Sequence, residues 1–109
     1  MGRALEVLLD ISRPSLTCAA HRVAGDIRLD LGDPRAAAEH HRTALDLAVR
    51  IGHRFHEAHA AEGLGRASGA LGRPAEAAEH RRRSLALFDA MGLPEAVRRR
   101  TSGAAEGCF

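Results

Sequence analysis

The chain repeats itself with a period of 40 residues. Residues 31–40 read LGDPRAAAEH and residues 71–80 read LGRPAEAAEH, and further along Leu45 recurs as Leu85. A fixed period of this length is typical of repeat proteins, in which each unit buries its apolar face only against its neighbours. Because the sequence has 109 residues, the period leaves room for little more than two units and therefore governs the whole fold.

A finer spacing of 20 residues marks where helices end and begin. Proline recurs on this spacing except at position 54, and glycine or serine lies two residues earlier, giving Ser12–Pro14, Gly32–Pro34, Gly52–Arg54, Gly72–Pro74 and Gly92–Pro94. Glycine ends a helix in the left-handed conformation, and proline suits the first position of the next helix. The spacing predicts helices over 3–11, 14–31, 34–51, 54–71 and 74–91 and a helix start at 94–100, with Asp33 as the N-cap of the 34–51 helix.

The segments between these breaks are rich in Ala, Leu, Arg and Glu, which favour helix. Connections this short force neighbouring helices to run antiparallel. The sequence therefore predicts an all-α fold of tandem antiparallel helical hairpins, an α-solenoid. Its expected organisation is a repeat domain over 1–100, made of a half repeat (2–12), two repeats (13–52 and 53–92) and the start of a further helix (93–100), followed by a disordered tail (101–109).

Apolar residues follow helical spacing in both copies. One face holds Ala37, Ala44, Leu45 and Ala48, and its counterpart holds Ala77, Ala78, Leu85 and Phe88. Gly63, Gly65 and Gly69 lie inside a predicted helix, where each costs up to about 1 kcal/mol relative to Ala, so we expect close helix contact there. The end helices are expected to expose Leu5, Val7, Leu8 and Ile11 at one end and Phe88 and Val97 at the other. Since about three repeats are normally needed for stability, we predict self-association, with exchange of a terminal helix as one route.

These positions resemble the tetratricopeptide repeat. The signature small and apolar positions are occupied by Leu64, Gly65, Gly72, Ala77 and Leu85, and in the first copy by Gly25, Gly32, Ala37, Ala44 and Leu45. The large aromatic residues of the motif are missing, and 40 residues exceeds the commoner period of 34. Residues 71–96 are similar to the C-terminal repeats of actinobacterial antibiotic-regulatory (SARP-type) transcriptional activators. The resemblance implies a protein–protein interaction module, either a fragment or a small member of a repeat-containing regulator of transcription or signalling. It does not extend to DNA binding or nucleotide hydrolysis, because no winged-helix region or phosphate-binding loop is present.

In such hairpins the first helix of each pair lines the concave side. The register of the resemblance places six residues there: Arg22, Asp26, Leu29, His59, Glu62 and Arg66. These side chains are mostly polar and mixed in sign. We therefore expect a peptide or protein partner with acidic or mixed charge, and groove residues that only contact solvent are the alternative.

Two other clusters have alternative interpretations. His53, His56 and His59 are spaced so that two could share a metal ion, but the third is rotated off that face, so polar surface histidines and no metal or cofactor are expected. The runs Arg81–Arg83 and Arg98–Arg100 suggest, as an alternative function, a nucleic-acid-associated regulator. No aromatic residues are interleaved for base stacking, and a solvated helix face is preferred.

Composition excludes several other classes of function. The net charge of +2 does not demand nucleic acid. Cys18 and His21 are spaced one helical turn apart, but a cysteine in an alanine-rich helix is usually a small buried residue, and no set of catalytic residues is evident. Cys18 and Cys108 lack metal-ligand spacing, which favours a reduced intracellular protein. With no signal-peptide core and no apolar run of about 20 residues, a soluble cytoplasmic protein that is not an enzyme is expected.

Overall fold

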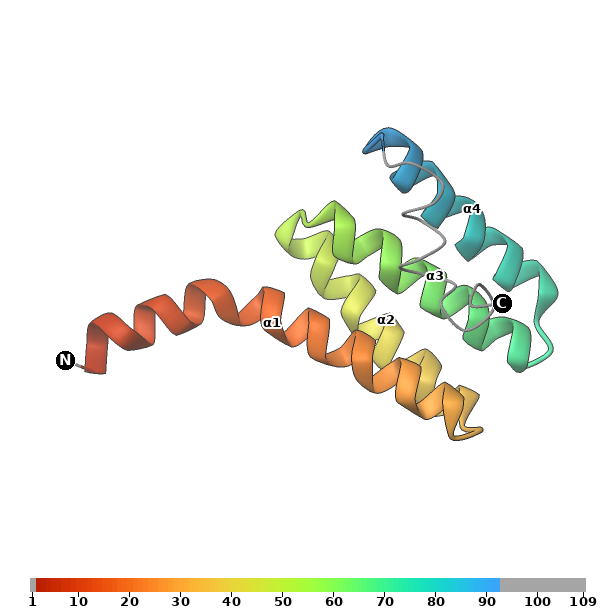
Figure 1. Ribbon diagram of the computed structural model, residues 1–109, viewed down its shortest axis with the longest axis horizontal. Coiled ribbons are helices and arrows are strands. Elements are labelled where there is room, and N and C mark those ends of the chain that lie inside the picture. The colour runs from red at the N-terminus through yellow and green to blue at the C-terminus, as the bar shows by residue number, and fades with distance from the viewer. Residues whose placement is uncertain (1, 93–109) are drawn as a thin grey trace, which may run out of the picture.

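Four helices form the fold in the computed structural model, which describes residues 2–92 and the side chains of residues 13–92. They are α1 (Gly2–Asp30), α2 (Pro34–Ile51), α3 (Arg54–Ala70) and α4 (Pro74–Ala90). The helices lie side by side in chain order, each packs on the next, and α1 also contacts α3 (Figure 1). This stack of antiparallel hairpins confirms the predicted all-α repeat fold. The helix start expected at 94–100 and the tail expected at 101–109 lie outside the described residues.

The helices end where the 20-residue spacing predicts. Gly52 has a φ of 70°, and its N–H donates to the Val49 carbonyl, which closes α2 in the left-handed conformation that glycine adopts without steric cost. Glycines 32, 72 and 92 share this positive φ. The Asp33 side chain accepts a hydrogen bond of 3.1 Å from the Ala36 N–H, which confirms the predicted N-cap. At the position without proline, His53 Nδ1 accepts from the His56 N–H at 3.2 Å and caps α3 instead.

The break expected between residues 11 and 14 is wrong. The first helix runs without interruption from Gly2 to Asp30 and contains Pro14. Ser12 stands where the later breaks have glycine, and no residue other than glycine has a positive φ in the described part of the chain. A serine adopts the left-handed conformation only at a cost, whereas an internal proline removes one helical hydrogen bond and allows a bend. The N-terminal half of α1 therefore continues as helix and extends past the neighbouring helices (Figure 1).

The core is built mainly from alanine. Its central cluster joins α1, α2 and α3 and contains Cys18, Ala44, Leu45, Ala48, Ala60 and Leu64, each at most 3 % exposed. Cys18 Sγ donates to the Ala44 carbonyl at 3.3 Å, and burial raises the pKa of this thiol. Cys18 is thus a small core residue held in its neutral form, as expected. Such small side chains let helix backbones approach closely.

The face that α4 turns to α3 differs from the prediction. Ala77, Ser84 and Phe88 are buried there, and Phe88 is only 1 % exposed, so the expectation of an exposed Phe88 is wrong. Leu85 is instead 54 % exposed. Both residues belong to one apolar stripe, and helical spacing alone does not decide which edge of that stripe meets α3.

Candidate protein-binding face

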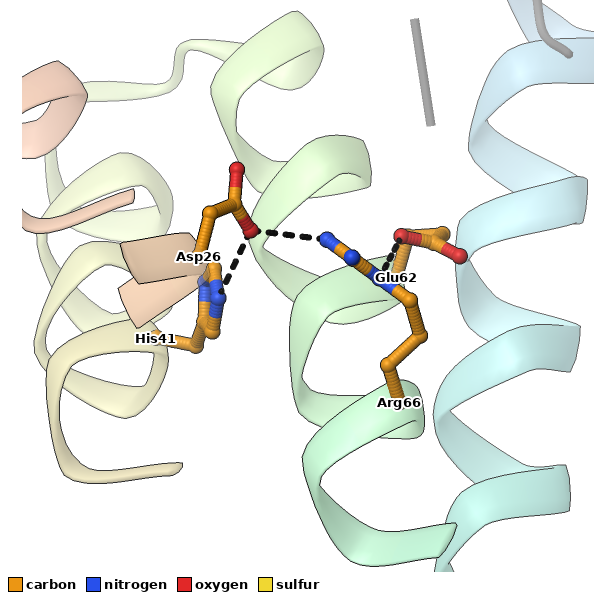
Figure 2. A network of polar contacts seen from close by, with 4 residues as sticks. All are labelled: Asp26, His41, Glu62 and Arg66. Carbon is orange, nitrogen blue, oxygen red and sulfur yellow. Dashed lines mark hydrogen bonds and ion pairs between the residues drawn. The ribbon is translucent and has the colours of Figure 1, made fainter. Parts of the chain in front are cut away.

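Three of the predicted binding residues form an ionic network between α1 and α3. Arg66 Nη2 lies 2.7 Å from Asp26 Oδ1, and Arg66 Nε donates to Glu62 Oε1 at 2.9 Å. Figure 2 shows the Asp26 carboxylate between His41 and Arg66, with Glu62 on the other side of Arg66. Because Asp26 comes from α1 and the other two from α3, the network joins the first helices of the two hairpins. We call the surface carrying Arg22, Asp26, Glu62 and Arg66 the α1–α3 face.

The network holds its members in their charged forms. Burial alone would raise the pKa of Asp26, but contact with His41 and the charge of Arg66 lower it below its ordinary value. Burial acts to lower the pKa of Arg66, and Glu62 and Asp26 more than offset it, so this pKa is raised. Two carboxylates thus neutralise one guanidinium, and the network itself attracts little further charge.

His41 was not predicted, although it lies beneath this network. Its ring is 1 % exposed and passes from α2 between Gly25 of α1 and Gly63 of α3, where a Cβ added to either glycine would lie less than 3 Å from the ring. The ring reaches Asp26, with Nε2 3.3 Å from Oδ1, a contact that does not have hydrogen-bond geometry. Two glycines therefore form a slot that admits one imidazole to the α1–α3 face from below. We call it the His41 slot.

Replacing Gly63 by alanine should lower the free energy of unfolding by about 2 kcal/mol, because overpacking against the ring outweighs the helix-forming gain of alanine. Gly69 is the matched control on the same helix, since a Cβ there meets nothing within 4 Å. Gly69→Ala should leave stability unchanged or raise it by up to about 1 kcal/mol. Urea unfolding followed by circular dichroism measures both. In a His41→Ala background the loss from Gly63→Ala should disappear, and an equal loss in both backgrounds would contradict the slot.

Gly65 and Gly69 complete the outcome for the helix glycines. A Cβ on Gly65 would lie 3.1 Å from Arg81 Cγ and 3.4 Å from the Ala77 carbonyl oxygen of α4. Close helix contact is therefore confirmed at Gly63 and Gly65. It is wrong at Gly69, which is exposed and faces open space.

Arg22 lies on the same face but has a different kind of partner. Its Nη1 donates to His56 Nδ1 at 2.8 Å, and His56 Nε2 lies 3.1 Å from Ser15 Oγ. Burial, together with His53 and Arg22, lowers the pKa of His56, so this partner is neutral. Burial also lowers the pKa of Arg22. Among the described residues, Arg22 has no carboxylate within ion-pair distance.

The remaining two predicted residues contribute less to this surface. Leu29 is partly buried on α1 and has no polar role. His59 is only 6 % exposed, and its ring packs edge-on against Phe55 and Phe88, with centroid separations of 4.4 and 5.1 Å. His59 therefore lies below the surface and supports it from within.

The histidine cluster does not converge on one point. The His53 and His56 rings stack 4.0 Å apart, whereas His59 packs between the two phenylalanines. Residues 2–92 contain no group of three or more side chains placed to hold a metal ion. Cys18 and His21 are also separate in function, because His21 Nδ1 lies 3.0 Å from His40 Nδ1 and the thiol donates to backbone.

The first arginine run is largely paired. Arg82 pairs with Glu79, and Arg83 pairs with Glu57 of α3 at 2.9 Å. The stem of Arg81 packs over Gly65. The second run, 98–100, lies outside the described residues. These pairs leave the 81–83 segment with little free positive charge.

A small hollow of about 240 Å³ lies between α2, α3 and α4. Its charged lining is mixed: Glu39, Arg42, Arg73, Glu76 and His80. None of the six predicted binding residues lines it. The α1–α3 face therefore remains the candidate site.

Comparison with known proteins agrees with this architecture. A family model described as tetratricopeptide repeat matches residues 15–90, which covers both hairpins. Neither the curated proteins nor the solved structures gave a match. No helix within the described residues is long and apolar enough to cross a membrane. Tetratricopeptide repeats form a non-enzymatic fold that generally mediates protein–protein interaction. The chain belongs to the tetratricopeptide repeat family.

Proposed function

We propose that the chain is a protein-interaction module of a regulator and that it binds an acidic peptide segment on the α1–α3 face. The observation that carries this proposal is Arg22, a partly buried cation whose only polar partner in the described structure is a neutral histidine. A guanidinium in this setting gains from an incoming carboxylate, because charge-assisted hydrogen bonds are stronger than neutral ones. The neighbouring Asp26–Arg66–Glu62 network is already balanced, so it would orient a peptide rather than attract it.

The regulatory role rests on the similarity of residues 71–96 to the repeats of antibiotic-regulatory activators. The proposed setting is therefore the cytoplasm, with the module acting within transcriptional control or signalling. The alternative, a nucleic-acid-associated regulator, is less well supported because Arg82 and Arg83 are paired with glutamates. Self-association, also predicted from the sequence, is taken up separately below.

Acidic eight-residue peptides should bind more tightly than neutral or basic peptides of the same length. Arg22→Gln should weaken this binding at least about tenfold, because it removes the unpaired charge and one charge-assisted hydrogen bond. Fluorescence anisotropy with labelled peptide pools measures the difference. Arg42→Gln is the matched control, since Arg42 is an exposed arginine of α2 without an ion pair among the described residues. Equal loss in both variants, or no preference for acidic pools, would contradict the proposal.

A further inference from the structure

An exposed apolar stripe runs along α1 on Leu16, Ala20, Val23 and Ile27, which we call the α1 stripe. The spacings of 4, 3 and 4 residues place these side chains on one side of the helix. Leu16 is 63 % exposed, Val23 57 % and Ile27 51 %. Single exposed apolar residues are ordinary, but a contiguous row of large ones indicates a contact surface.

The internal repeat shows what this side of a helix normally does. Forty residues further on, Ala20, Val23 and Ile27 correspond to Ala60, Gly63 and Ala67 of α3. All three of those positions are buried, and α2 supplies the contacts, with Leu45 near Ala60 and His41 against Gly63. The α1 stripe is thus the counterpart of a helix-packing face, and no helix among residues 2–92 covers it.

The side chains on the α1 stripe decide between two kinds of neighbour. A second copy could present α4 as α2 is presented to α3, through Ala78, Arg81 and Leu85. Val23 and Ile27 of α1, however, fill the space that Gly63 and Ala67 leave open on α3, and Arg81 replaces the inserted His41. Head-to-tail stacking of copies is therefore disfavoured. Large β-branched and leucine side chains at spacings of 3 and 4 are those of a helix pair joined along a seam.

The sequence of α1 is also symmetric about Leu16. Ala20, Val23 and Ile27 lie 4, 7 and 11 residues after it, and Ser12, Leu9 and Leu5 lie 4, 7 and 11 residues before it. An antiparallel pair of α1 helices crossing at Leu16 places position 9 of one copy opposite position 23 of the other, and position 5 opposite position 27. The 29 residues of α1 span about 43 Å. The N-terminal half extends clear of the other helices (Figure 1), so a second copy can reach it.

From the exposure, the repeat and this symmetry, we propose that two copies of the chain pair through antiparallel α1 helices about a two-fold axis near Leu16. Such a pairing uses the same patch on both partners and closes after two copies. It leaves the α1–α3 face outside the seam, so dimer formation and peptide binding are separable.

The full chain should sediment as a dimer at micromolar concentration. Leu16→Glu should weaken the dimer at least about a hundredfold, because it removes two buried leucines per pair. Leu85→Glu is the matched control, since Leu85 of α4 is 54 % exposed and lies off the stripe. Neither change should unfold the chain, which circular dichroism checks. A wild-type monomer at 100-fold higher concentration would overturn the proposal, and so would a dimer broken by Leu85→Glu and not by Leu16→Glu.

Disulfide trapping tests the orientation. In a Cys108→Ser background, chains carrying Leu9→Cys mixed with chains carrying Val23→Cys should form a mixed disulfide under mild oxidation, because an antiparallel seam sets these positions opposite each other. Cys18 is fully buried and should not compete. Each single variant oxidised alone should remain largely uncrosslinked. Efficient 9–9 or 23–23 disulfides without the mixed product would indicate a parallel pair and overturn the proposed axis.

Discussion

Phe88→Ala should lower the free energy of unfolding by about 3–5 kcal/mol, the usual cost of removing a fully buried phenylalanine. Phe88 is 1 % exposed, and its ring packs edge-on against His59 of α3 with centroids 5.1 Å apart. The other buried residues of α4 are Ala77 and Ser84, both small. Phe88 is therefore the large apolar contact that holds α4 on the stack, and its loss should release that helix first.

Urea unfolding measured by circular dichroism gives the magnitude. Leu85→Ala is the matched control, because this leucine lies one helical turn earlier on the same helix and is 54 % exposed. It should cost less than about 1 kcal/mol. If the two variants lost similar amounts of stability, α4 would be packed on a different face from the one described.

The second large effect is acid destabilisation through His59. Burial, followed by the charges of Arg22 and His56, lowers the pKa of His59 from 6.5 to about 4. Its Nε2 is buried and has no hydrogen-bond partner among the described residues. The unfolded chain binds this proton near pH 6.5, whereas the folded chain resists it down to about pH 4. The contribution of His59 is thus fully present above pH 6.5 and is lost as the pH falls towards 4, by about 3 kcal/mol.

His59→Gln separates this effect from the other histidines. Glutamine does not titrate, so the difference in free energy of unfolding between wild type and variant should narrow as the pH is lowered from 7 to 4. Chemical denaturation at half-unit pH intervals measures it. An NMR titration of the His59 ring gives an independent check, and a midpoint near 6.5 in the folded protein would contradict the buried, neutral ring.

The helix ends could be predicted from the sequence because their causes are local. A glycine followed two residues later by proline ends one helix and begins the next without help from distant residues, and Asp33 caps its own helix. The prediction failed at Ser12, where a single atom group replaces glycine's missing side chain and the helix continues through Pro14. At position 54 the cap came from His53, a role that histidine composition alone did not indicate.

The His41 slot could not be predicted because its parts are far apart in the sequence. Gly25, His41 and Gly63 meet only after three helices have packed. A partial signal was present, since Gly25 recurs as Gly65 while His41 is replaced by Arg81 in the second copy. The choice between Phe88 and Leu85 as the buried residue likewise depended on how α4 rotates against α3. The α1–α3 face was predicted from the register of the family motif, and that register placed Asp26, Glu62 and Arg66 close enough to pair.

The His41 slot has a consequence for how this protein can change in evolution. Solenoids grow when a unit is duplicated, which requires that each unit fit its own copy. A second copy of residues 53–92 placed after the first would bring Arg81, not histidine, against the counterpart of Gly63, and would leave that glycine's space unfilled. The two repeats are thus not interchangeable parts. Lengthening this solenoid by duplication should succeed only if histidine and its glycine pair are copied together.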